Sequence, residues 1–259
     1  MIDLSSSDLS PTRNLLFLAG DQLNEAFLKS ADFNPSLDTV IMIESLDESL
    51  RQRQHKTKIS YFFITMRRFA DWLKAKNVRV FYIQLAKSPL ATILNQIVQK
   101  IQHQKIIFFR PGEYKFLKMI QAALDGFDYE QLENPMFICS VQEFEEWSKA
   151  KKSLRMEYFY RHMRKKTGIL VREDNSLVGD RWNFDDMNRK PYRGKPAVPN
   201  NSEFELQSSE IELIAQVNRL FPDSFGINRP SLYPLDHQQA KSRWRSEEHT
   251  SELQSPDHL

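Results

Sequence analysis

NLLFLAGDQL, the stretch from Asn14 to Leu23, decides how the rest of this sequence is interpreted. Residues 15–19 form a short, unbroken apolar run that stops at Gly20, a pattern typical of a parallel strand covered on both faces. Because ligands bind beyond the carboxyl ends of such strands, we expect Asp21 and Gln22 to stand at a binding crevice. The same pattern fits a simple strand-to-loop turn equally well, with Gly20 as a residue of positive φ.

Further strand and helix signals alternate along the first half of the chain. Phe62, Met66, Phe69, Ala70 and Leu73 recur three and four residues apart, which predicts a helix with one buried face. Strands that alternate with helices of this length build βαβ units, so residues 1–134 are predicted to form an α/β domain, with a Rossmann-like parallel sheet and helices on both faces. The predicted strands are 15–19, 39–44, 78–85, 105–109 and 127–132, and the predicted helical segments are 48–74, 91–103 and 113–124.

The alternation stops after residue 134. Residues 141–150, 155–166 and 208–220 are predicted helices, and another is expected to begin near Asp236. Between them, Pro191, Pro196 and Pro199 exclude a long helix. The second part, residues 135–244, has few apolar residues for its length. It is therefore predicted to contain the beginning of a helical domain rather than a complete one, and the resemblance described below implies that a helical connector precedes this truncated domain.

Composition and motif content exclude several classes of protein. The 259 residues include 36 basic and 34 acidic side chains, and a net charge of +2 does not by itself indicate nucleic acid. The sequence contains no phosphate-binding loop of the Walker type, no G-x-G-x-x-G, no H-E-x-x-H and no G-x-S-x-G. Its one cysteine, Cys139, excludes an intrachain disulfide and cannot alone hold zinc or an iron–sulfur cluster, so we expect no metal site and a reducing, cytoplasmic location. The first ten residues lack the features of a signal peptide, and no apolar run approaches the ~20 residues that span a bilayer.

Positive charge is concentrated in residues 149–166. This segment contains eight Lys or Arg residues and a single acidic one, Glu157, with Tyr158, Phe159 and Tyr160 among them. A solvated helix face and an anion-binding face explain the pattern equally well.

The last fifteen residues differ abruptly from the rest. From Arg245 the chain reads RSEEHTSELQSPDHL, and the run RSEEHTSELQS resembles the in-frame translation of a widely used sequencing-adapter oligonucleotide. A natural polar terminus is the alternative. We expect residues 245–259 to be a non-native tail, the natural sequence to end near Trp244 and the real protein to be longer. The histidines and glutamates of the tail are therefore not treated as metal ligands.

Several longer stretches together resemble one known family. In chain order they are GDQL at 20–23, HKTKI at 55–59, MRRFADWL at 66–73, PGEY at 111–114, RMEYFYRHMRKKTGIL at 155–170, GDRWNFDDMNRKP at 179–191 and RLFPDSFG at 219–226. Together they resemble the amino-terminal part of the bacterial iron–sulfur cryptochrome/photolyase group, the prokaryotic (6-4) photolyase-related proteins. The resemblance covers residues 15 to about 244, and its two longest motifs are the most specific.

The resemblance implies an antenna domain at 1–134, a connector, and a helical domain that holds FAD and a four-cysteine [4Fe–4S] cluster. Such proteins use blue light to reduce the flavin, which donates an electron to a pyrimidine (6-4) lesion in damaged duplex DNA. The cluster cysteines and the flavin-binding half are missing here. We therefore expect an amino-terminal fragment without catalytic residues of its own, with FAD and the cluster only in a missing carboxyl-terminal half. The alternatives are a blue-light photoreceptor without repair, a Rossmann-like small-molecule-binding protein, and an adenylate-binding enzyme, which the missing glycines disfavour.

The antenna implied by the resemblance is a ribityl-lumazine bound by the first domain. Its hydroxyls suit Asp, Glu and Gln side chains, and Gly20 would let the ring approach the backbone. Where this chain has QHKTK at 54–58, the family more often has HHKKK, which leaves the identity of the antenna open. Glu48 and His55 fit equally well as helix-surface or capping residues. The candidate ligands are Gly20, Asp21, Gln22, Glu44, Glu48, His55 and Lys56.

The resemblance also implies DNA as a partner of the complete protein, which we expect to be a monomer without membrane contact. Arg161, Arg164 and Lys165 are the candidate contacts to the DNA backbone. Trp182 and Phe184 are expected to clamp the connector onto the first domain rather than to contact DNA. The polar groups expected to be satisfied within this clamp are those of Arg181, Asp185 and Arg189.

Overall fold

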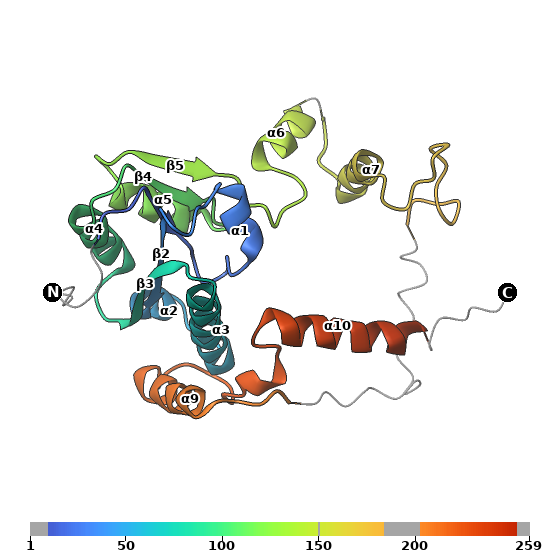
Figure 1. Cartoon of the computed structure of the whole chain (residues 1–259). Coiled ribbons are helices and arrows are strands. Elements are labelled where there is room, and N and C mark those ends of the chain that lie inside the picture. Colours follow the sequence, from blue (N-terminus) through green and yellow to red (C-terminus); the bar gives the residue numbers. More distant parts are fainter. Residues whose placement is uncertain (1–9, 150, 184–202, 253–259) are drawn as a thin grey trace. The chain divides into compact units, whose positions relative to one another are not determined.

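The computed structural model describes residues 10–149, 151–183 and 203–252, with side chains as far as Arg245 (Figure 1). The chain forms two compact units, Met1–Pro135 with Asn200–Leu259, and Met136–Pro199. The predicted part 135–244 is therefore divided between the two units. None of the described helices has the length and apolar character needed to cross a membrane.

A five-stranded parallel sheet forms the centre of the first unit, with the strand order β3-β2-β1-β4-β5. The order reverses at β1, which lies between β2 and β4, so the carboxyl ends of β1 and β4 flank a topological switch point. The predicted Rossmann-like α/β fold is confirmed. The strands are β1 (Asn14–Phe17), β2 (Thr39–Ser45), β3 (Arg79–Ala86), β4 (Lys105–Phe109) and β5 (Tyr129–Leu132).

Helices cover both faces of this sheet because successive side chains of each strand point to opposite sides. Leu16 is buried in the core beneath α1 and α3, whereas Leu15 and Phe17 are buried in a second core beneath α4 and α5. The helices concerned are α1 (Glu25–Ser30), α3 (Lys56–Ala75), α4 (Leu90–Lys100) and α5 (Tyr114–Ala123).

The single helical segment predicted over 48–74 is in fact two helices, α2 (Leu46–Leu50) and α3. The Ser45 hydroxyl caps α2 by accepting a hydrogen bond from the Glu48 N–H at 3.2 Å. His55 caps α3 in the same way, because its Nδ1 accepts from the Thr57 N–H at 3.1 Å. Each capping side chain starts a new helix, so the segment that was predicted as one continuous helix is divided into two.

The chain returns to α3 after residue 203. Leu213 and Val217 of α9 (Ser208–Leu220) are fully buried in the core that also contains α3, and Figure 1 shows the two helices together. Arg68 of α3 donates to both carboxylate oxygens of Glu210, at 2.6 and 2.9 Å. It also donates to Asp236 at 2.8 Å, just before α10 (His237–Glu252). The returning segment is thus fixed to the α/β unit. Helix α10 extends past Arg245, and the non-native origin of the tail stays a prediction.

The second unit contains α6 (Val141–Lys149) and α7 (Met156–Thr167), close to their predicted ranges. Helix α7 ends at Gly168, whose φ of +70° gives the expected left-handed cap. No residue of α6 is buried, and Arg164 is the one buried residue of α7. The helices pack through an aromatic group, Phe144, Trp147, Phe159 and His162.

Candidate binding site at the carboxyl edge of the sheet

The seven predicted ligands of the antenna all belong to the carboxyl edge of the sheet. Gly20, Asp21 and Gln22 follow β1, Glu44 lies near the end of β2, and Glu48 lies in the short α2 that comes next. Because β2 and β3 are parallel, α3 must run back across the sheet, so its first residues start from the same edge. Those first residues include His55 and Lys56.

Gln22 is buried at this edge, with 1% of its surface exposed. Its Oε1 accepts a hydrogen bond from the Ala19 N–H at 3.1 Å, and its Nε2 donates to the Phe109 carbonyl at 3.3 Å. The side chain therefore joins the end of β1 to the end of β4 across the switch point. Both ends of its amide are used within the fold.

Glu44 is fully buried and hydrogen-bonded through both oxygens. Its Oε1 accepts from Arg67 Nε at 2.7 Å and from the Tyr82 hydroxyl at 2.6 Å. Its Oε2 accepts from Arg67 Nη2 and the Leu85 N–H, each at 2.9 Å. Burial, together with the neighbouring Glu44 carboxylate, raises the pKa of Tyr82. The Glu44 carboxylate thus joins α3 to the ends of β2 and β3.

Close packing against α3, and not an unusual backbone angle, is the reason that glycine is required at position 20. A Cβ atom at this position would lie 3.1 Å from Met66 Sδ and 3.2 Å from Phe62 Cδ1, both from α3. Its φ is not among the positive values. The interpretation of Gly20 as a positive-φ turn residue is therefore corrected, and its role beside a bound antenna stays a prediction.

His55 serves as a capping and packing residue, one of the roles considered for it. Its ring packs edge-on against Phe225, with 5.3 Å between centroids, and a Cβ at Gly226 would fall 1.8 Å from its Nε2. The Lys56 N–H donates to the Phe225 carbonyl at 2.9 Å. HKTKI and RLFPDSFG, far apart in the sequence, are therefore neighbours in the fold.

Of the three carboxylates predicted as ligands, Asp21 and Glu48 have fewer internal contacts than Glu44. The Asp21 residue is exposed, yet protein atoms around the carboxyl group displace enough water to raise its pKa. Desolvation also raises the pKa of Glu48, with Arg51 acting in the opposite direction. Arg51 lies 3.3 Å from Glu48 and pairs through two hydrogen bonds of 2.6 Å with Glu113 before α5. Arg51 was not among the predicted site residues, although its partner Glu113 belongs to the PGEY motif.

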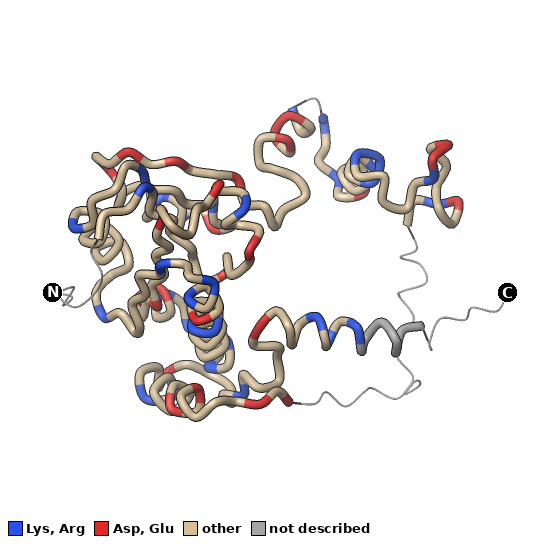
Figure 2. Tube along the Cα trace, viewed as in Figure 1, with Lys and Arg blue, Asp and Glu red and all other residues tan. Residues whose placement is uncertain are grey.

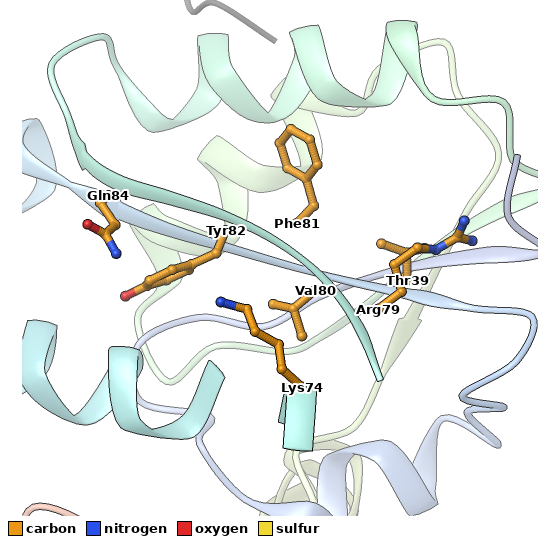
Figure 3. Close-up of a pocket in the computed structure, with 7 residues that line it drawn as sticks. All are labelled: Thr39, Lys74, Arg79, Val80, Phe81, Tyr82 and Gln84. Atoms are coloured by element: carbon orange, nitrogen blue, oxygen red, sulfur yellow. The ribbon is translucent and has the colours of Figure 1, made fainter. Parts of the chain in front are cut away.

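A hollow of about 320 Å³ lies away from these residues, beside edge strand β3 (Figure 3). In Figure 3 the Lys74 side chain of α3 extends across the face of β3 that carries Val80 and Tyr82. The lining contains none of the predicted antenna ligands, but the Tyr82 hydroxyl connects it to buried Glu44. The lining residues are Thr39, Lys74, Arg79, Val80, Phe81, Tyr82 and Gln84.

Comparison with known proteins agrees with the motif pattern. The model of the family described as deoxyribodipyrimidine photo-lyase-related protein matches residues 16–233. The chain belongs to this family. It is also 33% identical over 222 residues to a curated (6-4) photolyase of Agrobacterium fabrum (strain C58 / ATCC 33970). That match covers 82% of this chain and 43% of the relative, so the chain spans less than half the length of the curated relative it matches.

The DNA-contact candidates of this photolyase-related protein occupy unlike environments in the second unit. Arg164 is 3% exposed, and its two amino groups donate to four backbone carbonyls of the following loop. The prediction for Arg164 is corrected, because a guanidinium that is buried and bonded in this way is not accessible to a phosphate. Arg161 is half-exposed and paired with Glu157 at 2.8 Å, and Lys165 is exposed. The four carbonyls belong to Leu170, Val178, Arg181 and Trp182.

Trp182 packs on α7 within its own unit. The charged centres of Arg161, Lys165 and Arg164 lie 5.3, 5.5 and 5.7 Å from the centre of its indole ring. The next residue, Asn183, also contacts α7, because its side chain donates a hydrogen bond to Glu157 at 2.9 Å. The other predicted clamp residues Phe184, Asp185 and Arg189 lie outside the described residues, and the expected clamp onto the first unit stays a prediction.

Proposed function

We propose that this chain is the antenna-binding and connecting part of a light-dependent flavoprotein that repairs pyrimidine (6-4) lesions in DNA. The observation that carries the proposal is the 33% identity to a (6-4) photolyase along 82% of the chain. FAD would supply the electron for repair. We assign the [4Fe–4S] cluster to residues that this chain does not contain, because Cys139 alone cannot provide four thiolate ligands. We assign FAD to the same part, because this chain covers only 43% of the (6-4) photolyase that it matches.

The carboxyl edge of the sheet is the proposed site for a ribityl-lumazine antenna. Asp21 and Glu48 would accept hydrogen bonds from ribityl hydroxyls, with Lys56 nearby as a donor. Their raised pKa values support this role, since a partly desolvated carboxylate gains from each new donor. Gln22, Glu44 and His55 would support the site indirectly, because their side chains hold β1, β4 and α3 in place. The negative charge of Asp47 and Glu113 near Glu48 favours a neutral ligand over an anion.

Titration of the purified chain with the ribityl-lumazine, followed by ligand fluorescence, tests this site. Replacing Asp21 by Ala or Glu48 by Leu should each weaken binding by about 1–3 kcal/mol, because a ligand hydroxyl loses its acceptor. Asp71→Ala is the matched control, since this carboxylate on α3 is 76% exposed and lies outside the proposed site. Absence of binding to the parent chain, or unchanged binding by both site variants, would refute the antenna assignment.

Lys165 and Arg161 are the residues that we propose contact the DNA backbone. The basic residues of α7 are evident in Figure 2. Replacing Lys165 by Ala should weaken duplex binding regardless of sequence and flatten the log–log salt dependence by ~0.9 for each phosphate that the variant no longer neutralises. Arg161→Ala should do less, because Arg161 already pairs with Glu157. An unchanged salt slope in both variants would mean that these residues do not contact DNA and belong to a solvated helix face.

A further inference from the structure

Cations lie over aromatic rings at several places in the second unit. Lys151 Nζ is 5.6 Å from the ring centre of Trp147, and the Arg155 guanidinium is 5.8 Å from that of Tyr158. Trp182 is approached by three further cations from α7. An aromatic ring in a cationic environment attracts an anion that also carries a flat aromatic group, as nucleotides do.

Tyr158 is the most accessible of these rings, with 47% of its surface exposed. Trp147 and Trp182 are partly buried, and Tyr160 lies over the buried Arg164. Tyr158, Arg161 and Lys165 are spaced three and four residues apart on α7 and therefore share one helix face. The exposed ring is thus bordered by cations along the helix, and by Arg155 at its beginning.

The charge around this ring is complementary to a polyanion. Of the eight basic residues at 149–166, Arg164 is buried and Arg161 and Lys166 pair with glutamates. The other five have no carboxylate within ion-pair distance among the residues that the structure describes. They are Lys149, Lys151, Lys152, Arg155 and Lys165.

We propose that Tyr158 is a stacking platform for an unpaired base, so that the second unit binds single-stranded DNA as well as the duplex backbone. The bases of an intact duplex are stacked on one another, and their faces are not accessible to a side chain. A single strand, or a nucleotide displaced from a duplex, offers that face together with its phosphate. The proposal rests on the DNA-binding part of the proposed function.

Binding of the full chain to a fluorescein-labelled oligothymidylate and to a duplex of the same length tests the role of Tyr158. Tyr158→Ala should weaken oligothymidylate binding between about 5- and 150-fold, the equivalent of ~1–3 kcal/mol for one stacked base. It should leave duplex binding nearly unchanged. Tyr158→Phe should keep the affinity for both. An oligothymidylate that carries one 2-aminopurine should be quenched by the parent and by Tyr158→Phe, and less by Tyr158→Ala.

Tyr114→Ala is the matched control. Tyr114 is 69% exposed with a lysine over its ring at 5.5 Å, but it follows Glu113 in the other unit, so neither DNA should bind differently. Equal weakening for the two DNAs in Tyr158→Ala, or no weakening at all, would overturn the stacking role. A chain that binds duplex but not oligothymidylate would overturn this inference alone. A chain that binds neither would also overturn the DNA-binding part of the proposed function.

Discussion

At the scale of single residues, internal partners decide which candidate side chains are free to bind a ligand. Glu44 and Asp21 are both carboxylates at the carboxyl edge of one sheet. Glu44 is enclosed by donors from α3 and β3, whereas Asp21 is exposed with a raised pKa. The same contrast separates Arg164 from Lys165, one residue apart on α7. Residue type made all four of them candidates, and their surroundings show that Glu44 and Arg164 have structural partners, whereas Asp21 and Lys165 are exposed.

Replacing Glu44 by Leu should destabilise the first unit by ~3–5 kcal/mol, because Arg67 is left as an uncompensated cation in a mostly buried position. Urea unfolding of the two proteins measures the difference. The double replacement Glu44→Leu with Arg67→Met should recover much of this stability. Glu25→Gln, which breaks an exposed pair with Lys29, should have little effect. A small effect of Glu44→Leu would contradict the structural role assigned to this carboxylate.

Replacing Asp21 by Asn should raise thermal stability at neutral pH. The folded protein holds the Asp21 proton more tightly than the unfolded chain because its folded-state pKa is raised. Ionisation therefore costs stability as pH rises from the ordinary pKa of Asp, near ~4, through the raised folded value. At lower pH both states are protonated and the advantage of Asn should vanish. Melting temperatures of both proteins across this range provide the test, and a gain that persists in acid would exclude this origin.

At the scale of elements, α3 connects the sheet to the returning chain. Arg67 and Arg68 are adjacent in sequence and point about 100° apart around the helix, so Arg67 meets Glu44 at the sheet while Arg68 meets Glu210 on α9. At the start of the same helix, His55 packs against the loop at Phe225 and Gly226. The position of α3, and with it the carboxyl edge of the sheet, therefore depends on residues more than 140 positions later.

Gly226→Ala should be far more damaging than Gly126→Ala, although the two glycines have nearly the same φ, +83° and +82°. Both changes carry the ~1–2 kcal/mol strain of a left-handed backbone. At Gly226 the new methyl group also overlaps the His55 ring, whereas nothing lies within 4 Å at Gly126. Denaturant unfolding measures both costs. In a His55→Ala background the cost at Gly226 should fall towards that at Gly126, and equal costs in the parent would argue against this contact.

At the scale of the whole molecule, each of the two units is stabilised internally by a different kind of contact. The first unit has two apolar cores, one on each face of its sheet. The second has no buried residue on α6 and relies on an aromatic group and on Arg164, whose guanidinium gathers four carbonyls of the loop that follows. Arg164 is the one buried residue among those described between 136 and 183, so this part should have little cooperative stability and should open before the first unit does.

Replacing Arg164 by Met should therefore unfold the second unit and leave the first intact. The change strands carbonyl groups at a cost of ~1–3 kcal/mol for each buried acceptor without a partner. Amide hydrogen exchange should accelerate in α7 while the amides of β1 and β4 keep their protection. Lys165→Met is the control, because this neighbouring cation is exposed and its removal should not change exchange. Equal acceleration in both units would show that they unfold together.

The sequence by itself determined the fold class, the family and which candidate residues follow the strands at the carboxyl edge of the sheet. Apolar runs such as 15–19 specify buried strands through their composition, and strands alternating with helices leave few topologies other than a doubly wound sheet. The break between α2 and α3 and the return of α9 to α3 were decided only in the tertiary structure. Capping by His55 and pairing of Arg68 with Glu210 depend on which distant groups meet. For the same reason, the sequence alone could not separate buried Glu44 and Arg164 from exposed Asp21 and Lys165: burial and partnership are properties of the packed chain, not of residue type.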